Sequence, residues 1–216
     1  MKIIHEYRDK QHITQFFDDY GNLQPLLGND HVPIYGIELE VESTSKDWWH
    51  NGEVTQSLEL FAARVIAGND NLRCSHDSSL VNGFEITTTP GSLGYYTNVF
   101  DWSFLDVIRD YSKSKIDEIG EKGFHIHINK SSFQDEEHMV RFAEAITTEV
   151  LNGSYMFLVD KYCRPEVSSG RYCDRYVSVN LQNSRTVEVR CFIPTTDKQE
   201  IINYIKYMGI MQGETK

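Results

Sequence analysis

The sequence has little that would direct it to a membrane or to nucleic acid. No apolar run approaches the roughly 20 residues that a bilayer-spanning helix needs, and the first ten residues, MKIIHEYRDK, are too polar for a secretory signal. The formal net charge of -11 argues against a nucleic-acid partner bound through a broad basic face. We therefore expect a cytoplasmic protein that binds neither membranes nor nucleic acid.

Several familiar site motifs are also missing. The four cysteines (Cys74, Cys163, Cys173 and Cys191) have no CxxC spacing, so we interpret them as reduced thiols and not as a zinc or disulfide pair. There is no GxxxxGK[ST] loop and no GxGxxG after a strand. A nucleotide, if one binds, is therefore not held in either of those ways.

The length of the chain and the mixed order of its predicted strands and helices indicate one α+β domain. The chain has 216 residues, of which 40% are hydrophobic, and it contains no internal repeat, linker or low-complexity segment. We expect residues 1–33 to be an N-terminal extension that packs on a main domain, residues 34–216. Hydrophobic periodicity predicts strands at 34–42, 81–88, 124–129, 175–181 and 186–193, and helices at 55–67, 103–112, from a Ser132–Asp135 capping box to Gly153, and after Asp197. Residues 154–174 are expected to loop over the site.

Three of these strands carry polar side chains at every second position. The runs are GIELEVE with Glu38 and Glu40, GFHIHIN with His125 and His127, and RTVEVR with Arg185, Glu188 and Arg190. Residues two apart on a strand point the same way, and the intervening residues are mostly Ile and Val. The pattern predicts a sheet with one apolar face and one charged face.

The charged face has the composition of a metal site. Glu38 and Glu40 would repel each other unless a cation or solvent intervened, and Mg²⁺ prefers oxygen ligands. Imidazole is a common metal ligand, and arginine grips phosphoryl oxygens in fork geometry. A purely structural interpretation also remains open for each run: a solvated strand for the first, hydrogen-bonded histidines for the second and a Glu188–Arg190 ion pair for the third. The HxH run lacks the following glutamate of a cupin, because those positions are Ser131 and Ser132.

A fourth run, HDSSLVNGFEITTTP at residues 76–90, completes a series. Along the chain the order is G-x-E-x-E, D-x-S with G-x-E-[IL]-x-[ST]-x-P, G-x-H-[IV]-H, and R-T-[IV]-E-x-R. This series resembles the amidoligase branch of the carboxylate-amine ligase superfamily, which includes glutamine synthetase and γ-glutamylcysteine ligase. The resemblance covers residues 34–195 in four islands.

The resemblance implies a fold and a reaction. The fold would be a curved antiparallel sheet, a glutamine synthetase-like half-barrel, with helices packed on its convex face. Its concave face would bind ATP and two or more Mg²⁺ ions. The enzyme would phosphorylate a carboxylate to an acyl phosphate, which an amine then attacks. The partners would be carboxylate- and amine-bearing substrates, either small molecules or peptides, and homo-oligomerisation stays open.

The resemblance also implies roles for individual residues. Metal ligands would be Glu38, Glu40, Glu85, His125 and Glu188. His125 and His127 would face the bound nucleotide. Arg171 and Arg175, close to the start of the last two predicted strands, would reach it as well. Arg190 would stabilise the transferred phosphoryl group, with Arg185 and Glu40 as further catalytic residues.

Two other classes of function remain as alternatives. A metal-dependent hydrolase or oxygenase would use His125, His127 and a glutamate to bind Fe²⁺ or Zn²⁺. A non-catalytic binding protein could retain the same fold.

Overall fold

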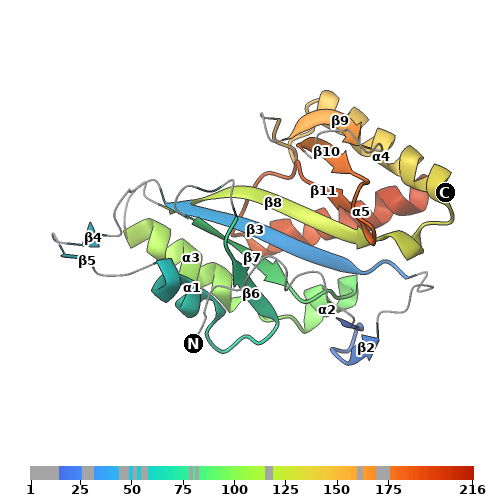
Figure 1. The fold of residues 1–216 in the computed structure, drawn as a ribbon. Coiled ribbons are helices and arrows are strands. Elements are labelled where there is room, and N and C mark those ends of the chain that lie inside the picture. Colours follow the sequence, from blue (N-terminus) through green and yellow to red (C-terminus); the bar gives the residue numbers. More distant parts are fainter. Residues whose placement is uncertain are drawn as a thin grey trace.

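The fold centres on one seven-stranded open sheet (Figure 1). The computed structural model describes residues 15–25, 32–43, 49–50, 53–54, 58–77, 80, 83–114, 119–159, 163–168 and 176–216. The sheet order is β6-β7-β3-β8-β11-β10-β9. Neighbouring strands are antiparallel except β9 and β10, which are parallel.

The strands are β1 (Gln15–Phe17), β2 (Leu23–Pro25), β3 (Tyr35–Ser43), β4 (Trp49–His50), β5 (Glu53–Val54), β6 (Leu72–Ser75), β7 (Gly83–Thr88), β8 (Ile119–Asn129), β9 (Arg164–Ser168), β10 (Val177–Asn180) and β11 (Thr186–Val189). The helices are α1 (Leu58–Ile66), α2 (Leu93–Asn98), α3 (Ser103–Ser114), α4 (Glu136–Leu151) and α5 (Lys198–Glu214). β1 pairs with β2 and β4 with β5 as separate two-stranded sheets. None of the helices in the described segments has the length and apolarity to cross a bilayer.

The central strands have the two unlike faces that their alternation predicts. Leu39 of β3 and Ile126 of β8 are buried in the hydrophobic core. Phe61 of α1, Ile108 of α3 and Ile205 of α5 belong to the same core cluster. In Figure 1 α5 passes behind the strands, and α1 and α3 lie together next to β6 and β7. The apolar face therefore packs on helices, and the polar residues between the apolar positions lie on the other face.

The helix caps correct one prediction and confirm another. Ser132 does not begin α4: it lies in a 3-10 turn, Lys130–Ser132, and its hydroxyl donates to the Asn129 carbonyl. Asp135 is the N-cap instead, because its carboxylate accepts the His138 amide hydrogen at 2.7 Å. Asp197 caps α5 as predicted, accepting the amide hydrogens of Gln199 and Glu200. The carboxylates at the N-termini of α4 and α5 also interact favourably with the positive ends of the helix dipoles.

Other differences from the predicted elements concern short or irregular segments. The segment 154–174, predicted to be a loop, contains β9, and the parallel β9–β10 pair departs from a wholly antiparallel sheet. β6 and α2 were not predicted, because four and six residues are too few for a clear period. β8 begins at Ile119, five residues before the predicted start at 124. The predicted helix at 55–67 is α1, and residues 55–57 lie outside the described part.

The described part of the segment before β3 contacts the connection between β7 and α2 through Phe17. Its amide donates to the Pro90 carbonyl at 2.9 Å, and its carbonyl accepts the Ser92 amide hydrogen at 2.9 Å. The Phe17 ring stacks on Tyr95 with ring centroids 4.6 Å apart. These contacts join the β1–β2 hairpin to the connection between β7 and α2.

Candidate functional site

Strand register brings the polar residues of the three runs together. Glu38 of β3 stands opposite His125 of β8, and His127 of β8 stands opposite Glu188 of β11. Because directly opposed residues point to the same face, these side chains converge although they are far apart in the chain. In the pair that β3 forms with its other neighbour, β7, Glu40 stands opposite Glu85.

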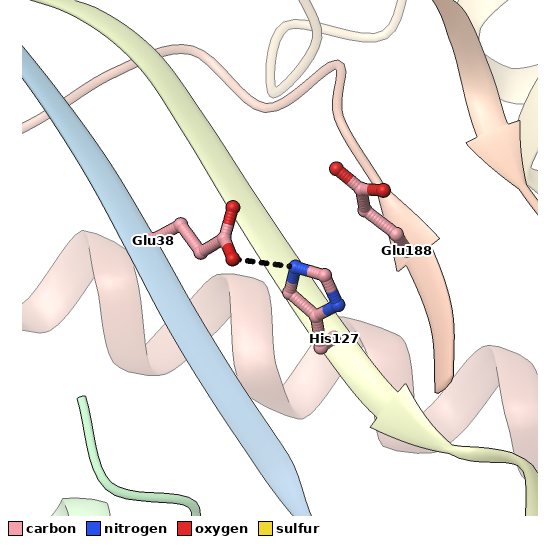
Figure 2. A group of neighbouring side chains, drawn as sticks. All are labelled: Glu38, His127 and Glu188. Carbon is pink, nitrogen blue, oxygen red and sulfur yellow. Dashed lines mark ion pairs between the residues drawn. The ribbon is translucent and has the colours of Figure 1, made fainter. Parts of the chain in front are cut away.

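Glu38, His127 and Glu188 form the candidate metal group. Each offers one ligand atom, and these atoms all lie within 4.8 Å of one another. Figure 2 shows the three side chains converging from three adjacent strands. Two carboxylate oxygens and one imidazole nitrogen make a donor set that suits a divalent cation. Within the described residues this group contains His127 and not His125.

His127 has one ring nitrogen engaged and one directed at the carboxylates. Its Nδ1 lies 3.0 Å from Thr186 Oγ1, and its Nε2 lies 3.2 Å from Glu38 Oε1. Nε2 is buried and makes no well-aligned hydrogen bond among the described residues. Burial lowers the pKa of His127, but the negative charges of Glu38, Glu188 and Glu85 outweigh it and raise the pKa to about 9. In the metal-free protein Nε2 therefore carries a proton directed at Glu38, and a cation bound between these groups would take the place of that proton.

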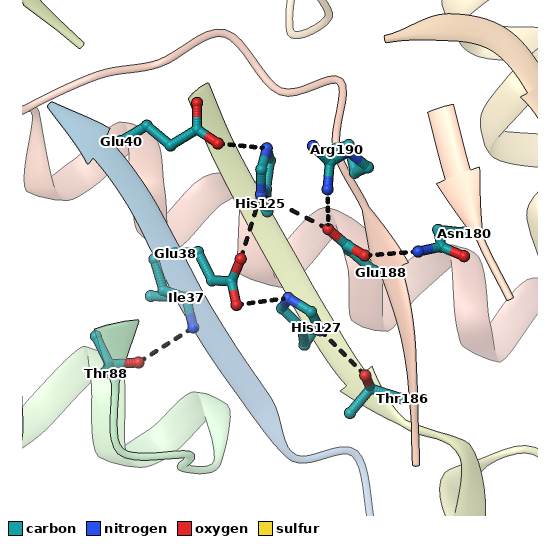
Figure 3. A network of polar contacts seen from close by, with 10 residues as sticks. All are labelled: Ile37, Glu38, Glu40, Thr88, His125, His127, Asn180, Thr186, Glu188 and Arg190. Carbon is teal, nitrogen blue, oxygen red and sulfur yellow. Dashed lines mark hydrogen bonds and ion pairs between the residues drawn. The ribbon is translucent and has the colours of Figure 1, made fainter. Parts of the chain in front are cut away.

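His125 lies among three carboxylates. Its Nδ1 is 3.3 Å from Glu38 Oε2 and 3.6 Å from Glu188 Oε1, and its Nε2 is 3.7 Å from Glu40 Oε1 (Figure 3). It is 4% exposed, so solvent does not screen these contacts. His125 therefore lies between Glu38 and Glu40, the two carboxylates expected to repel each other.

Glu188 is held from two sides by donors. Asn180 Nδ2 donates to Oε2 at 2.9 Å, and Arg190 Nη1 donates to Oε1. Burial raises the pKa of Glu188, but the positive charges of His127, Arg190 and His125 outweigh it and lower the pKa. The carboxylate therefore stays ionised, as a metal ligand must.

Arg190 extends past the end of β11. Burial lowers the pKa of its guanidinium, but the charge and hydrogen bond of Glu188 outweigh it and raise the pKa. The guanidinium carbon lies 5.8 Å from the centre of the Tyr176 ring, and Nε is buried without a hydrogen bond among the described residues. Arg190 thus remains a cation with a donor to offer.

Most of these side chains line one cavity of about 700 Å³. The residues predicted for the site that line it are Glu38, Glu85, His125, His127, Arg185, Glu188 and Arg190. Arg185 is exposed, in the turn between β10 and β11. Glu40, 8% exposed, does not line the cavity. Arg171 and Arg175 lie outside the described residues, so their predicted role remains a prediction.

Sequence reasoning missed three residues of the site. Asn180 stands opposite Glu188 in the antiparallel β10–β11 pair, a register that the alternation of either strand alone does not give. Thr186 lies within the RTVEVR run but carries no charge to draw notice. Tyr176 precedes β10, and nothing in the sequence indicates that its ring lies near Arg190.

Comparisons with known proteins add little to this geometry. No protein-family profile matches the chain, and no curated protein matches it. A solved structure described as a novel glutamine synthase homolog is similar with a TM-score of 0.46 and 9% identity, over 91% of this chain and 61% of that chain. An aspartate kinase from Clostridium acetobutylicum is similar with a TM-score of 0.31 and 9% identity, over 85% of this chain and 34% of that chain. The chain thus spans less than two thirds of either structure, and likeness at this level carries no argument about activity.

Proposed function

We propose that the protein is an ATP- and Mg²⁺-dependent ligase that joins a carboxylate to an amine through an acyl phosphate. The observation that carries the proposal is the Glu38–His127–Glu188 group in a cavity of about 700 Å³, with Arg190 beside it. The cavity is large enough for a drug-sized ligand. The order of the four sequence motifs supplies the choice of reaction.

The site residues have distinct roles in this proposal. Glu38, His127 and Glu188 would hold a divalent cation, which draws the phosphoryl oxygens together and offsets their charge. Arg190, fixed by Glu188, would donate to the oxygens of the transferred phosphoryl group as their charge develops. Glu85, 2% exposed on β7, and Glu40 would hold a further cation beside His125.

The reaction proceeds in two transfers. An oxygen of the acid's carboxylate attacks the γ-phosphorus of ATP, the bond to the β-phosphate oxygen breaks, and ADP leaves. The amine nitrogen then attacks the acyl carbon, phosphate leaves, and the amine loses a proton. A site whose charges are already fixed by ion pairs and hydrogen bonds needs little reorganisation in either step.

The finer description of the fold belongs to the same proposal. We assign the apolar face, which packs on α1, α3 and α5, to the convex side of a half-barrel and the polar face to its concave side. The hydrolase or oxygenase alternative needs both histidines with a carboxylate around one metal. It has less support, because the group within ligand distance contains one histidine and two carboxylates.

The direct test is calorimetric titration of the Mg²⁺ complex of a non-hydrolysable ATP analogue into the protein. We expect binding that requires Mg²⁺ and that is lost in Glu38→Gln and in Glu188→Gln. Glu166→Gln, which changes a solvent-exposed glutamate of β9, is the matched control and should bind as the wild type does. Absence of heat at saturating concentrations of the complex would refute the proposal; binding would justify a screen of acid and amine pairs.

A further inference from the structure

Gly123 of β8 lies directly beneath the carboxylate of Glu40. The two residues stand opposite each other in the β3–β8 pair. A Cβ atom at Gly123 would overlap Glu40 Oε2 and would lie 2.7 Å from Glu40 Cδ. Real Cβ atoms essentially never approach so closely, and because the overlapping atoms are the far end of a flexible side chain, it is the Glu40 carboxylate that would move. The Glu40 carboxylate therefore occupies the volume in which any other residue at position 123 would have its side chain.

Space, and not backbone conformation, is what requires glycine here. Among the described residues the glycines with positive φ are Gly21, Gly68 and Gly153, so the backbone of Gly123 is in a region open to any residue. A glycine in the interior of a strand weakens the strand, because it adds backbone entropy to the unfolded chain and has no side chain to pack. The approach of Glu40 gives this otherwise unfavourable glycine a function.

The strand pairing is irregular at the same point. Glu40 pairs with Gly123, but the next residue, Val41, pairs with Glu121, so β8 has one extra residue there. Such a bulge bends the strand and increases its twist, and bulges commonly redirect side chains beside active sites. The bulge and the glycine together allow the Glu40 side chain to fold across β8.

The folded position brings Glu40 to His125. Glu40 Oε1 lies 3.7 Å from His125 Nε2, while His125 Nδ1 contacts the carboxylates of Glu38 and Glu188. A side chain at position 123 would force the Glu40 carboxylate off β8 and away from this imidazole. His125 would then lose one of its three carboxylate neighbours, at the edge of the Glu38–His127–Glu188 group.

We propose that Gly123 is a positioning residue of the site. Because it has no side chain, the Glu40 carboxylate can lie against His125, and this contact sets the cation affinity. The link to cation affinity rests on the proposed function; the contact between Gly123 and Glu40 does not. Gly36 provides a matched control on the same polar face, opposite His127. A Cβ at Gly36 would lie 3.8 Å from His127 Cβ, which is an ordinary contact.

The contact is tested without any cation by a double-mutant cycle on thermal unfolding. Gly123→Ala should lower the unfolding midpoint by a few degrees in the wild-type background. In a Glu40→Ala background the same substitution should leave the midpoint unchanged or raise it, because alanine costs less backbone entropy than glycine. Equal losses in the two backgrounds would overturn the proposal.

The effect on the site is tested by titrating Mn²⁺ alone into the folded variants. Gly123→Ala should weaken Mn²⁺ binding about 10-fold or more, as loss of an outer support does in metal sites, while Gly36→Ala stays close to wild type. Shortening the carboxylate in Gly123→Ala/Glu40→Asp should restore part of the affinity, which general damage to the sheet would not do. Wild-type affinity in Gly123→Ala would overturn the positioning role. Absence of Mn²⁺ binding in the wild type would refute the proposed function, and the unfolding cycle would still decide whether Glu40 depends on Gly123.

Discussion

The Thr186 hydroxyl oxygen lies 3.0 Å from Nδ1 of His127, while Nε2 of the same ring lies 3.2 Å from Glu38. When Nδ1 donates its proton to the hydroxyl, the lone pair of Nε2 points toward Glu38 and Glu188. That is the tautomer a metal-binding histidine needs, and a hydrogen bond from the second nitrogen commonly fixes it.

Thr186→Val should therefore weaken divalent-cation binding. Valine has nearly the same shape but no acceptor, so the ring loses the contact that fixes its orientation. We expect a 10- to 100-fold loss of Mn²⁺ affinity, measured by calorimetry. Thr186→Ser keeps the hydroxyl and should retain most of the affinity; equal losses in the two variants would show that the hydroxyl is not what matters.

The raised pKa of His127 predicts a pH dependence of stability in the metal-free protein. Its folded pKa of about 9 is above its unfolded value of 6.5, so its stabilising contribution is complete below pH 6.5 and is lost as the pH rises through 9. The free energy of unfolding should fall by about 2–3 kcal/mol across this range. Denaturant unfolding at several pH values would measure this, and His127→Gln should flatten the curve. An unchanged slope in that variant would assign the effect to other groups.

Removing Arg190 should destabilise the protein, because Glu188 would remain as a buried carboxylate with fewer partners. Arg190 and Glu188 side chains are 13% and 6% exposed, so solvent compensates little. Arg190→Met should cost about 3 kcal/mol in urea unfolding. The double variant Arg190→Met/Glu188→Gln should recover part of this loss, and a purely additive result would contradict the ion-pair explanation.

Asn129 is expected to contribute stability at the end of β8. Its amide oxygen accepts the Ile34 amide hydrogen at 2.8 Å, and its nitrogen donates to the Val32 carbonyl and to Ser131 Oγ. Asn129→Ala would leave the Ile34 amide without this acceptor and should cost about 2–3 kcal/mol in urea unfolding. Asn203→Ala, at an exposed position of α5, should change stability by less than about 0.5 kcal/mol.

The sequence predicts the central strands well, because their alternation is strong and local. Glu38, His125 and Glu188 are candidates for the same reason: each is a charged or titratable group flanked by apolar residues on both sides. The parallel pairing of β9 could not be predicted, because Arg164–Ser168 carries no alternation to reveal it. Asp135 takes the cap that Ser132 was expected to form because the chain first makes a 3-10 turn, which adds residues before α4.

The details of the site depend on three-dimensional information that alternation does not contain. Alternation puts His125 and His127 on one face but does not distinguish their surroundings. Pairing of β8 with β3 and β11 brings Nε2 of His127 close to Glu38 and Glu188, while His125 lies among Glu38, Glu188 and Glu40. Likewise, Gly123 is recognisable as a motif glycine, but only the side-chain conformation of Glu40 reveals what that glycine accommodates.

The three members of the candidate metal group come from β3, β8 and β11, which are the first, the fourth and the last, in chain order, of the six strands that pair antiparallel in the main sheet. During synthesis, a growing chain cannot assemble the group until Glu188 has emerged, so an incomplete protein would lack this cation-binding group. A cation bound here would stabilise only the chain whose distant strands have all paired, and so would favour completion of the whole sheet over partly folded forms.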